Sequence, residues 1–434
     1  MTAVSATPDV NASAVPAAQR GRPRSGFWAA AFAFLIVMAV ATLPSPLYGL
    51  YRTRDHLSAL TITVVFAIFA ASTIAILQRD SSITARIGRR GTMLGAVATM
   101  MVAVGVLAAW KDLPGLLIGR LITGVAVGLA AGTAITYLIE LRLRADPTTS
   151  PVRARTIGTS VTVGALGIGP LIAGFLAQWV AQPLTVPYLV FIALGAIALI
   201  GLRAAPETGA PATQQQPAGS QRKARLPVPA AAATLAAFSA NGLFAGLSGL
   251  FLATTLHHPS HALSGAALFL LFACGVLSQL ATLPASRVLA LGTASMIAGL
   301  VLLVVSVRLS TPNLAMFLTA GALIGAGSGA VFKGTTGIVL GASPPESRVA
   351  MTSDLLIALY VGLSVPVIGA GVALSRGASA PDTVLWFAVL VGLGVTVSGW
   401  VLLRPRPSGS ELAGIRSPRA GSPDSGDAGS PAGE

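Results

Sequence analysis

The sequence has little charge, a single cysteine and few histidines. Charged residues make up 10% of the 434 residues and hydrophobic residues 54%, whereas soluble chains carry about 25% charge. The one cysteine, Cys274, excludes an intramolecular disulfide and a thiolate metal cluster. Three of the four histidines, His257, His258 and His261, cluster without a carboxylate. We interpret them as part of a solvated loop and expect no metal site.

The sequence also lacks the motifs of common enzymes. No Gly-x-x-x-x-Gly-Lys-Ser/Thr segment occurs, which excludes ATP binding through a P-loop. Neither His-Glu-x-x-His nor Gly-x-Ser-x-Gly is present, and no pair of carboxylates is placed for acid–base chemistry. We therefore expect a protein that is not an enzyme and that needs no cofactor.

The sequence does contain many long apolar runs. Runs of 18 or more apolar residues are long enough to cross a hydrocarbon core of about 30 Å as helices. The sequence predicts twelve such spans, at residues 27–49, 60–78, 92–110, 115–140, 157–180, 184–202, 230–255, 263–283, 290–307, 314–340, 350–375 and 383–403.

An internal repeat relates the fourth predicted span to the tenth. Four residues spaced by four in one span are matched 201 residues later in another: Arg120, Gly124, Gly128 and Gly132 correspond to Gly321, Gly325, Gly329 and Lys333. Residues four apart share a helix face, and a face of small residues lets two membrane helices approach closely. We expect an all-α integral membrane protein whose twelve transmembrane helices form two pseudo-symmetric six-helix bundles.

The placement of basic residues predicts the orientation. The net charge of +14 is concentrated in segments that lie on one side if both termini are cytoplasmic, as the positive-inside rule requires. The outer loops then hold only Arg52, Arg54, Lys111, Arg308 and Arg376. The excess of basic residues therefore reflects membrane topology. We expect the protein to lie in a lipid bilayer and to bind no nucleic acid. The predicted location is the plasma membrane.

Composition divides the chain into five parts. We expect a disordered cytoplasmic tail at 1–25, an N-terminal six-helix bundle at 26–204, a cytoplasmic linker at 205–228, a C-terminal bundle at 229–404 and a second disordered tail at 405–434. The first span ends in Pro44-Ser45-Pro46. Two interpretations stay open there: a broken helix that lines a cavity, or an aromatic belt of Tyr48 and Tyr51 at the headgroups.

Three motifs make the chain similar to the major facilitator superfamily. The segment between the second and third spans ends in Arg86, Gly88, Arg89 and Arg90, although Ser81 and Ala85 replace the family's glycine and aspartate. The fourth span carries Arg120, Gly124 and Gly128. The fifth span resembles the Gly-Pro motif that the family associates with proton-coupled exporters, through Gly169, Pro170 and Gly174, and Pro366 echoes it in the eleventh span.

The resemblance implies a central cavity and alternating access. Charged groups within spans are then the first candidates for the pathway. Arg120 is either a cation of the cavity or a structural cation bonded to carbonyls of a kinked neighbour. Lys333 and Asp354 have similar predicted depth and are expected to form an ion pair, which either exchanges protons or is a static salt bridge.

The remaining candidates are weaker. We expect Glu140 to pair with Arg142 or Arg144, with a role as a coupling acid as the alternative. Asn241 and Gln279 either bind substrate or form hydrogen bonds between helices. Tyr360 either lines the cavity or packs in the interior.

These features favour a secondary transporter. The predicted function is export of a small organic compound, a drug or a metabolite, by proton antiport, with the proton as coupling ion and the protein as a monomer. The alternatives are an importer or facilitator of a sugar or organic acid, and a membrane protein of this kind that does not transport.

Overall fold

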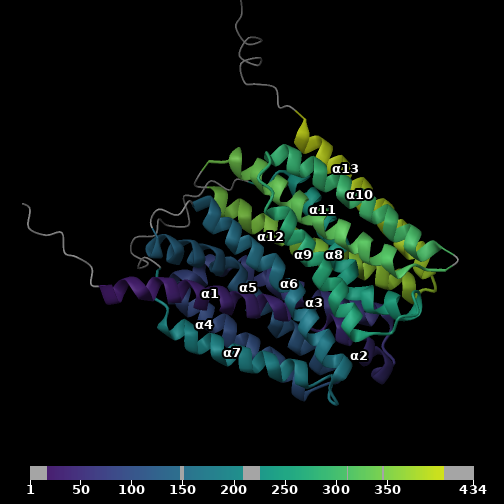
Figure 1. Cartoon of the computed structure of the whole chain (residues 1–434), viewed down its shortest axis with the longest axis horizontal. Coiled ribbons are helices and arrows are strands. Elements are labelled where there is room, and N and C mark those ends of the chain that lie inside the picture. The colour runs from purple at the N-terminus through teal and green to yellow at the C-terminus, as the bar shows by residue number, and fades with distance from the viewer. Residues whose placement is uncertain (1–16, 147–150, 209–224, 310, 345–346, 405–434) are drawn as a thin grey trace, which may run out of the picture. The chain divides into compact units, whose positions relative to one another are not determined.

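The computed structural model describes residues 17–146, 151–208, 225–309, 311–344 and 347–404 (Figure 1). The predicted tail at 405–434 and most of the linker, 209–224, lie outside the described residues. Residues up to Leu402 form one compact unit. Its helices are α1 Ala17–Thr42, η1 Ser45–Leu47, α2 Tyr48–Asp55, α3 Ala59–Leu77, α4 Asp80–Ala109, α5 Leu113–Ala145, α6 Pro151–Trp179, α7 Val186–Ala204, α8 Val228–Thr254, α9 His261–Gln279, α10 Ala285–Arg308, α11 Leu314–Gly341, α12 Arg348–Ser375 and α13 Ala380–Leu403.

The described residues form helices and no strands, as expected for an all-α membrane protein. Eleven helical segments are long and apolar enough to cross a membrane, the first of them combining α1, η1 and α2. The twelfth is α6, a 29-residue helix whose described apolar part is Val163–Trp179. Large apolar side chains such as Ile200, Trp386 and Leu390 are about 70% exposed, which fits surfaces that face lipid.

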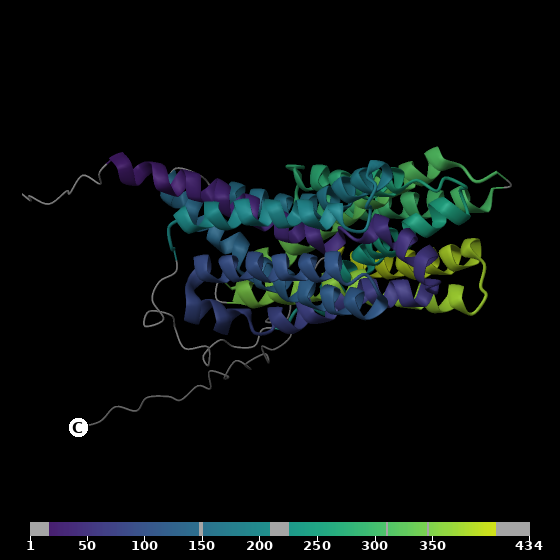
Figure 2. The same ribbon diagram turned by 90° about the horizontal axis from the view of Figure 1, so that it is seen from below.

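The helices run alongside one another (Figure 2), and α1, η1 and α2 together form the first span. The end of the unit that holds α2, the α8–α9 connection and the α12–α13 connection is called the α2 end below. The opposite end, which holds Gly88 and Glu207, is called the Glu207 end. The sequence predicts that the α2 end faces outward.

The first span is broken where the two prolines occur. Helix α1 stops at Thr42, a short 3₁₀ turn covers Ser45–Leu47, and α2 continues from Tyr48. Helix α1 also begins at Ala17, so it includes residues assigned from the sequence to a disordered tail. Tyr48 and Tyr51 are buried, and the two hydroxyls of Tyr51 and Tyr188 lie 3.2 Å apart. The aromatic-belt interpretation is therefore wrong for these two tyrosines.

The segment before the third span is helical, which differs from the loop that its sequence predicts. Helix α4 begins at Asp80 and is interrupted only at Gly88, whose φ of 75° and ψ of 172° are not helical. A positive φ is easy for glycine and strained for other residues. Gly88 thus divides α4 into a short basic helix and a longer membrane helix.

The internal repeat is visible in how the glycines pack. A Cβ on Gly124 of α5 would overlap the carbonyl oxygen of Phe69 in α3, and a Cβ on Gly325 of α11 would overlap that of Leu271 in α9. The two glycines are 201 residues apart in sequence, and their partners are 202 apart. The same holds one turn on, where Gly128 meets Thr73 and Gly329 meets Gly275. The fourth and tenth spans are therefore packed in equivalent ways within α1–α7, the first half, and α8–α13, the second half.

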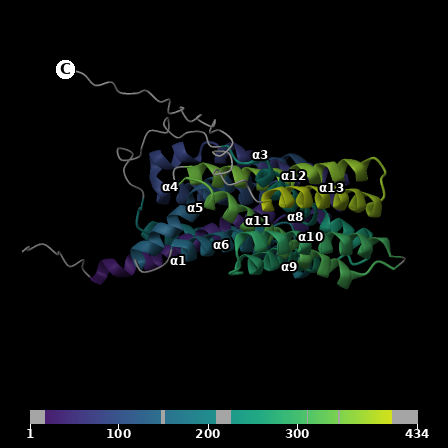
Figure 3. The same ribbon diagram turned by 90° about the horizontal axis from the view of Figure 1, so that it is seen from above.

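Two pairs of helices join the halves. Helix α6 packs along α9, and α3 packs along α12 (Figure 3). These two pairs make up most of the contact between the halves.

Candidate transport pathway

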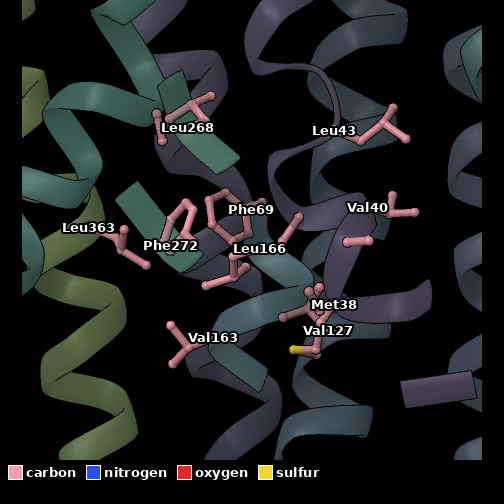
Figure 4. Close-up of a cluster of buried hydrophobic side chains, with 14 of the residues drawn as sticks. Met38, Val40, Leu43, Phe69, Val127, Val163, Leu166, Leu268, Phe272 and Leu363 are labelled. Atoms are coloured by element: carbon pink, nitrogen blue, oxygen red, sulfur yellow. The ribbon is translucent and has the colours of Figure 1, made fainter. Parts of the chain in front are cut away.

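The middle of the boundary between the halves is filled with apolar side chains (Figure 4). Phe69 of α3, Leu166 of α6, and Leu268 and Phe272 of α9 are all buried there. Tyr360 of α12 is also buried, with its ring edge-on to Phe69 at a centroid distance of 6.2 Å. Tyr360 therefore packs between the halves, at the position where a pathway would open.

The Gly-Pro segment of α6 brings three helices into backbone contact. A Cβ on Gly169 would overlap the carbonyl of Ala39 in α1, and one on Gly174 would overlap the carbonyl of His261 in α9. Pro170 has no N–H, so the carbonyl of Leu166 loses its helical donor. The hydroxyl of Thr42 donates to that carbonyl at 2.6 Å. Sequence reasoning missed Thr42, although the proline four residues after Leu166 is a signal that a partner is needed.

Arg120 is a structural cation in this conformation. Its side chain is fully buried and donates to the carbonyls of Ala41 at 2.6 Å, Phe66 at 3.1 Å and Val65 at 3.3 Å. The guanidinium carbon also lies 4.3 Å from the ring centroid of Phe69, a distance at which a cation is attracted to an aromatic face. The expectation that Arg120 lines an open cavity does not hold here. The alternative, a bond to carbonyls of a broken neighbouring helix, holds in part, because the carbonyl of Ala41 belongs to the broken first span, whereas those of Val65 and Phe66 belong to the continuous helix α3.

A small cavity of about 160 Å³ lies at the α2 end, between α2, α3 and α8. The break in the first span supplies Ser45, Tyr48 and Arg52 to its wall, and α8 supplies Gly246, Leu250 and Thr254. This supports the cavity interpretation of the double proline. The cavity is lined from both halves, so its size depends on how far apart they stand.

Lys333 does not form the predicted ion pair with Asp354. Its ammonium group donates to the carbonyl of Gln279 at 2.5 Å and to that of Ala281. These carbonyls close the C-terminal end of α9, where the helix dipole favours a cation. Asp354 is half-buried on α12 and has no ion-pair or hydrogen-bond partner among the described residues. The similar predicted depth of Lys333 and Asp354 therefore did not bring the two side chains into contact, because Lys333 binds the carbonyls at the end of α9 instead.

Glu140 pairs with Arg89, which corrects the expectation that it pairs with Arg142 or Arg144. Arg144 instead donates to the carbonyls of Glu207 and Thr208, at 2.9 and 3.2 Å. The carboxylate of Glu140 is thus neutralised at the Glu207 end, where α4 and α5 meet. A group held this way is a poor candidate for a coupling acid.

Glu207 completes the basic segment of α4. Its two carboxylate oxygens each accept a backbone N–H, from Arg89 and Arg90, both at 3.0 Å. These N–H groups start the helix that follows Gly88, where a carboxylate is favoured. A Cβ on Gly88 would lie only 2.7 Å from a carboxylate oxygen of Glu207. Gly88 is therefore needed for both its positive φ and this contact, whereas Arg86 is exposed.

The two amide candidates lie in the second half and are buried. Asn241 on α8 is 2% exposed and Gln279 on α9 is 3% exposed. Within the described residues, Asn241 Oδ1 and Gln279 Nε2 have no hydrogen-bond partner. Pro366 lies inside α12 and borders a groove between α8, α12 and α13. Buried amides with free hydrogen-bonding capacity are the usual means of recognising a neutral polar group.

The histidines do not behave as one solvated loop. His257 and His258 are exposed, whereas His261 is half-buried at the start of α9, with Nδ1 3.2 Å from the carbonyl of Pro46. Among the described residues no group of three metal-binding side chains occurs. His261 is thus a contact between the halves, which sequence reasoning missed because Pro46 is 215 residues away.

The comparisons with known proteins agree with this architecture. The family described as the Major Facilitator Superfamily matches residues 30–289. Solved structures of a nucleoside transporter, NupG, have the same fold: a point mutant of it superposes with a TM-score of 0.66 at 10% identity, covering 87% of this chain and 99% of that one. A second NupG structure gives 0.63 at 13% identity, covering 88% and 99%. No curated protein matches the sequence.

Eleven membrane-length helices, together with the shorter apolar part of α6, define a polytopic membrane protein. Because the family match covers more than half of its length, the chain belongs to the Major Facilitator Superfamily. The identities with NupG are low, so this likeness concerns the fold alone.

Proposed function

We propose that the protein exports a small organic compound across the plasma membrane by proton antiport, with alternating access between its halves. The observation that carries the proposal is the Gly-Pro segment of α6, whose glycines place α6 in backbone contact with α1 and α9. A segment of this kind resembles that of proton-coupled exporters, and here it lies at the contact that must open and close. Both termini are proposed to be cytoplasmic, as the basic residues predict.

Asp354 is the proposed proton carrier. Among carboxylates whose side chains the structure describes, it alone has no ion-pair or hydrogen-bond partner: Asp55 and Asp112 pair with Arg54, Glu140 with Arg89 and Asp382 with Arg308, while Glu207 binds backbone N–H groups and Asp146 is also bonded. A half-buried carboxylate without a fixed cation can gain and lose a proton as its access to water changes.

The substrate is proposed to be neutral or weakly polar. The boundary between the halves is apolar, and its buried cation, Arg120, is already bonded to three carbonyls. Asn241 and Gln279 provide free amide groups in the second half. This chemistry fits a solute with an apolar body and a few hydrogen-bonding groups.

The first test measures both the direction of transport and its coupling to the proton gradient. A pump-deficient host that expresses the chain is challenged with a panel of drugs and metabolites, with and without a protonophore. Protection that disappears with the protonophore is the expected result. Greater sensitivity to a compound would show uptake, and the proposed direction would be wrong.

The second test concerns Asp354. In proteoliposomes with an imposed pH gradient, D354N is expected to abolish accumulation of the transported compound, because the amide cannot carry a proton. The matched control is D382N, since Asp382 is an exposed carboxylate paired with Arg308 at 2.5 Å. Unchanged accumulation by D354N would remove Asp354 from the mechanism.

A second candidate function is movement of a nucleoside or another polar solute down its gradient. The free amides of Asn241 and Gln279 favour it, because a base or a sugar offers several donors and acceptors. The panel should therefore include nucleosides. Equilibration in vesicles without any gradient would support a facilitator over the antiporter.

A further inference from the structure

The start of α9 is bonded to the other half by a glutamine. Gln178, near the end of α6, places Oε1 2.9 Å from the backbone N–H of His261, 3.2 Å from Ser260 Oγ and 3.4 Å from the N–H of Ala262. The first N–H groups of a helix have no partner within that helix. Ser260 covers one of them, since its hydroxyl accepts from the N–H of Leu263 at 3.2 Å. Gln178 therefore completes the cap of α9 from across the boundary.

A second bond joins the same turn to the broken first span. The ring of His261 lies against η1, with Nδ1 3.2 Å from the carbonyl of Pro46. The Pro46 carbonyl belongs to η1, the short turn that interrupts the first span at its two prolines. The first turn of α9 is thus attached to two elements of the first half, α6 and η1.

The helix backbones touch just below these bonds. A Cβ on Gly174 of α6 would overlap the carbonyl of His261, and a Cβ on Gly265 of α9 would overlap the carbonyl of Pro170. Two helices in backbone contact leave no passage between them. A solute reaches the α2 end along α6 and α9 only after this contact separates.

We propose that Gln178 and His261 form a latch that holds the α2 end closed, and that the strength of these bonds sets how often the transporter opens there. The latch consists of Gln178, Ser260, His261 and Pro46. It contains neutral hydrogen bonds and no ion pair, so it opens more readily than a buried salt bridge would. The inference rests on the proposed alternating access, and it assigns the control of one of the two open states to named side chains.

The test measures opening directly, without transport. In a C274A background, Ser264, which is 2% exposed and lies one turn after His261, is replaced in an S264C reporter. Purified protein in detergent is then labelled with a water-soluble maleimide, so the membrane orientation does not matter. The variants compared are Q178A, H261A, the conservative Q178E and the control Q182A, since Gln182 is exposed in the loop that follows α6.

We expect Q178A and H261A to raise the labelling rate roughly two- to tenfold, as the loss of one or two neutral hydrogen bonds predicts. Q178E keeps an acceptor for the same N–H groups, with a charge that the helix N-terminus favours, so it should label no faster than the parent. Q182A should match the parent. Equal rates for Q178A, Q178E and the parent would overturn the latch.

A cross-link covers the case in which Q178A does not fold. In the C274A background, Q178C and A262C should be joined by a short bifunctional thiol reagent, because the glutamine side chain spans the gap between the two backbones, and this cross-link should stop transport. Failure to cross-link would contradict the latch. If labelling follows the expected order but no compound moves in vesicles, the latch stands and the proposed function fails.

Discussion

At the scale of single residues, two cations within membrane helices, one fully buried and one half-buried, show how charge is tolerated in this membrane protein. Arg120 donates to the carbonyl of Ala41 at the end of α1 and to two carbonyls within α3, and Lys333 donates to two carbonyls at the C-terminal end of α9. Carbonyls without a helical donor need a partner in lipid, and a cation without acceptors is costly there. The carbonyls therefore stabilise the cation, and the cation provides the donors that the carbonyls need.

Replacing Arg120 tests this arrangement. R120K keeps the charge, but an ammonium cannot place donors on three carbonyls at once or stack on Phe69. We expect the free energy of unfolding to fall by about 1–3 kcal/mol, as for loss of buried hydrogen bonds. Thermal unfolding of the purified protein in detergent measures it.

The control is R54K. Arg54 is exposed and pairs with Asp55 and Asp112, and exposed ion pairs contribute little. Equal stability of R120K and the parent would show that the three carbonyls do not depend on the guanidinium.

Residue partners were also where sequence reasoning was weakest. Lys333 and Glu140 were identified as charged residues within membrane helices, but their predicted partners were wrong. Both side chains are long, so several acceptors or donors fall within reach, and the choice depends on where α9 ends and where Gly88 breaks α4. Neither the end of α9 nor the break at Gly88 can be predicted from the spacing of residues along one helix.

At the scale of helices, glycine spacing determines which pairs come close. Gly325 and Gly329 of α11 lie against the backbone of α9, as Gly124 and Gly128 of α5 lie against α3. The residues at these positions must be small, because an added Cβ at each would lie within 3.0 Å of a backbone carbonyl oxygen of the partner helix.

A substitution at Gly325 should therefore separate α9 from α11. G325V is expected to lower the free energy of unfolding by about 1–3 kcal/mol, the usual cost of overpacking. The control is G369A on α12, where an added Cβ would meet no atom within 4 Å. Thermal unfolding compares them, and equal melting temperatures would contradict the close contact.

The helices themselves were predictable because hydropathy and length determine them. The twelve spans and the glycine repeat follow from composition and from spacing by four. The break at Gly88 was not predicted, because the N–H groups that follow it are bonded by Glu207, which is more than one hundred residues away in sequence. Long-range contacts of this kind leave no local signal.

At the scale of the whole molecule, the two halves meet at α3–α12 as well as at α6–α9. A Cβ on Gly371 of α12 would overlap the hydroxyl of Thr63 in α3. This second contact is independent of the latch, so the two can be tested separately.

Gly371 offers a way to force the halves apart. G371L places a large side chain between α3 and α12, and we expect it to shift the protein toward the state open at the α2 end. Labelling of the S264C reporter should then rise in G371L, although Gly371 makes no contact with the latch residues. G369L is the matched control two residues away, and faster labelling in both variants alike would point to general loosening instead.

The carbonyls that hold the two cations have one more property in common. Arg120 binds Ala41, Val65 and Phe66, and Lys333 binds Gln279 and Ala281, all of which precede their cation in the chain. A ribosome therefore completes each set of acceptors before it makes the cation that needs them. Insertion of a charged helix is unfavourable in isolation, so α5 and α11 enter the bilayer most easily beside helices already there. The order of synthesis thus matches the order in which the charges are neutralised.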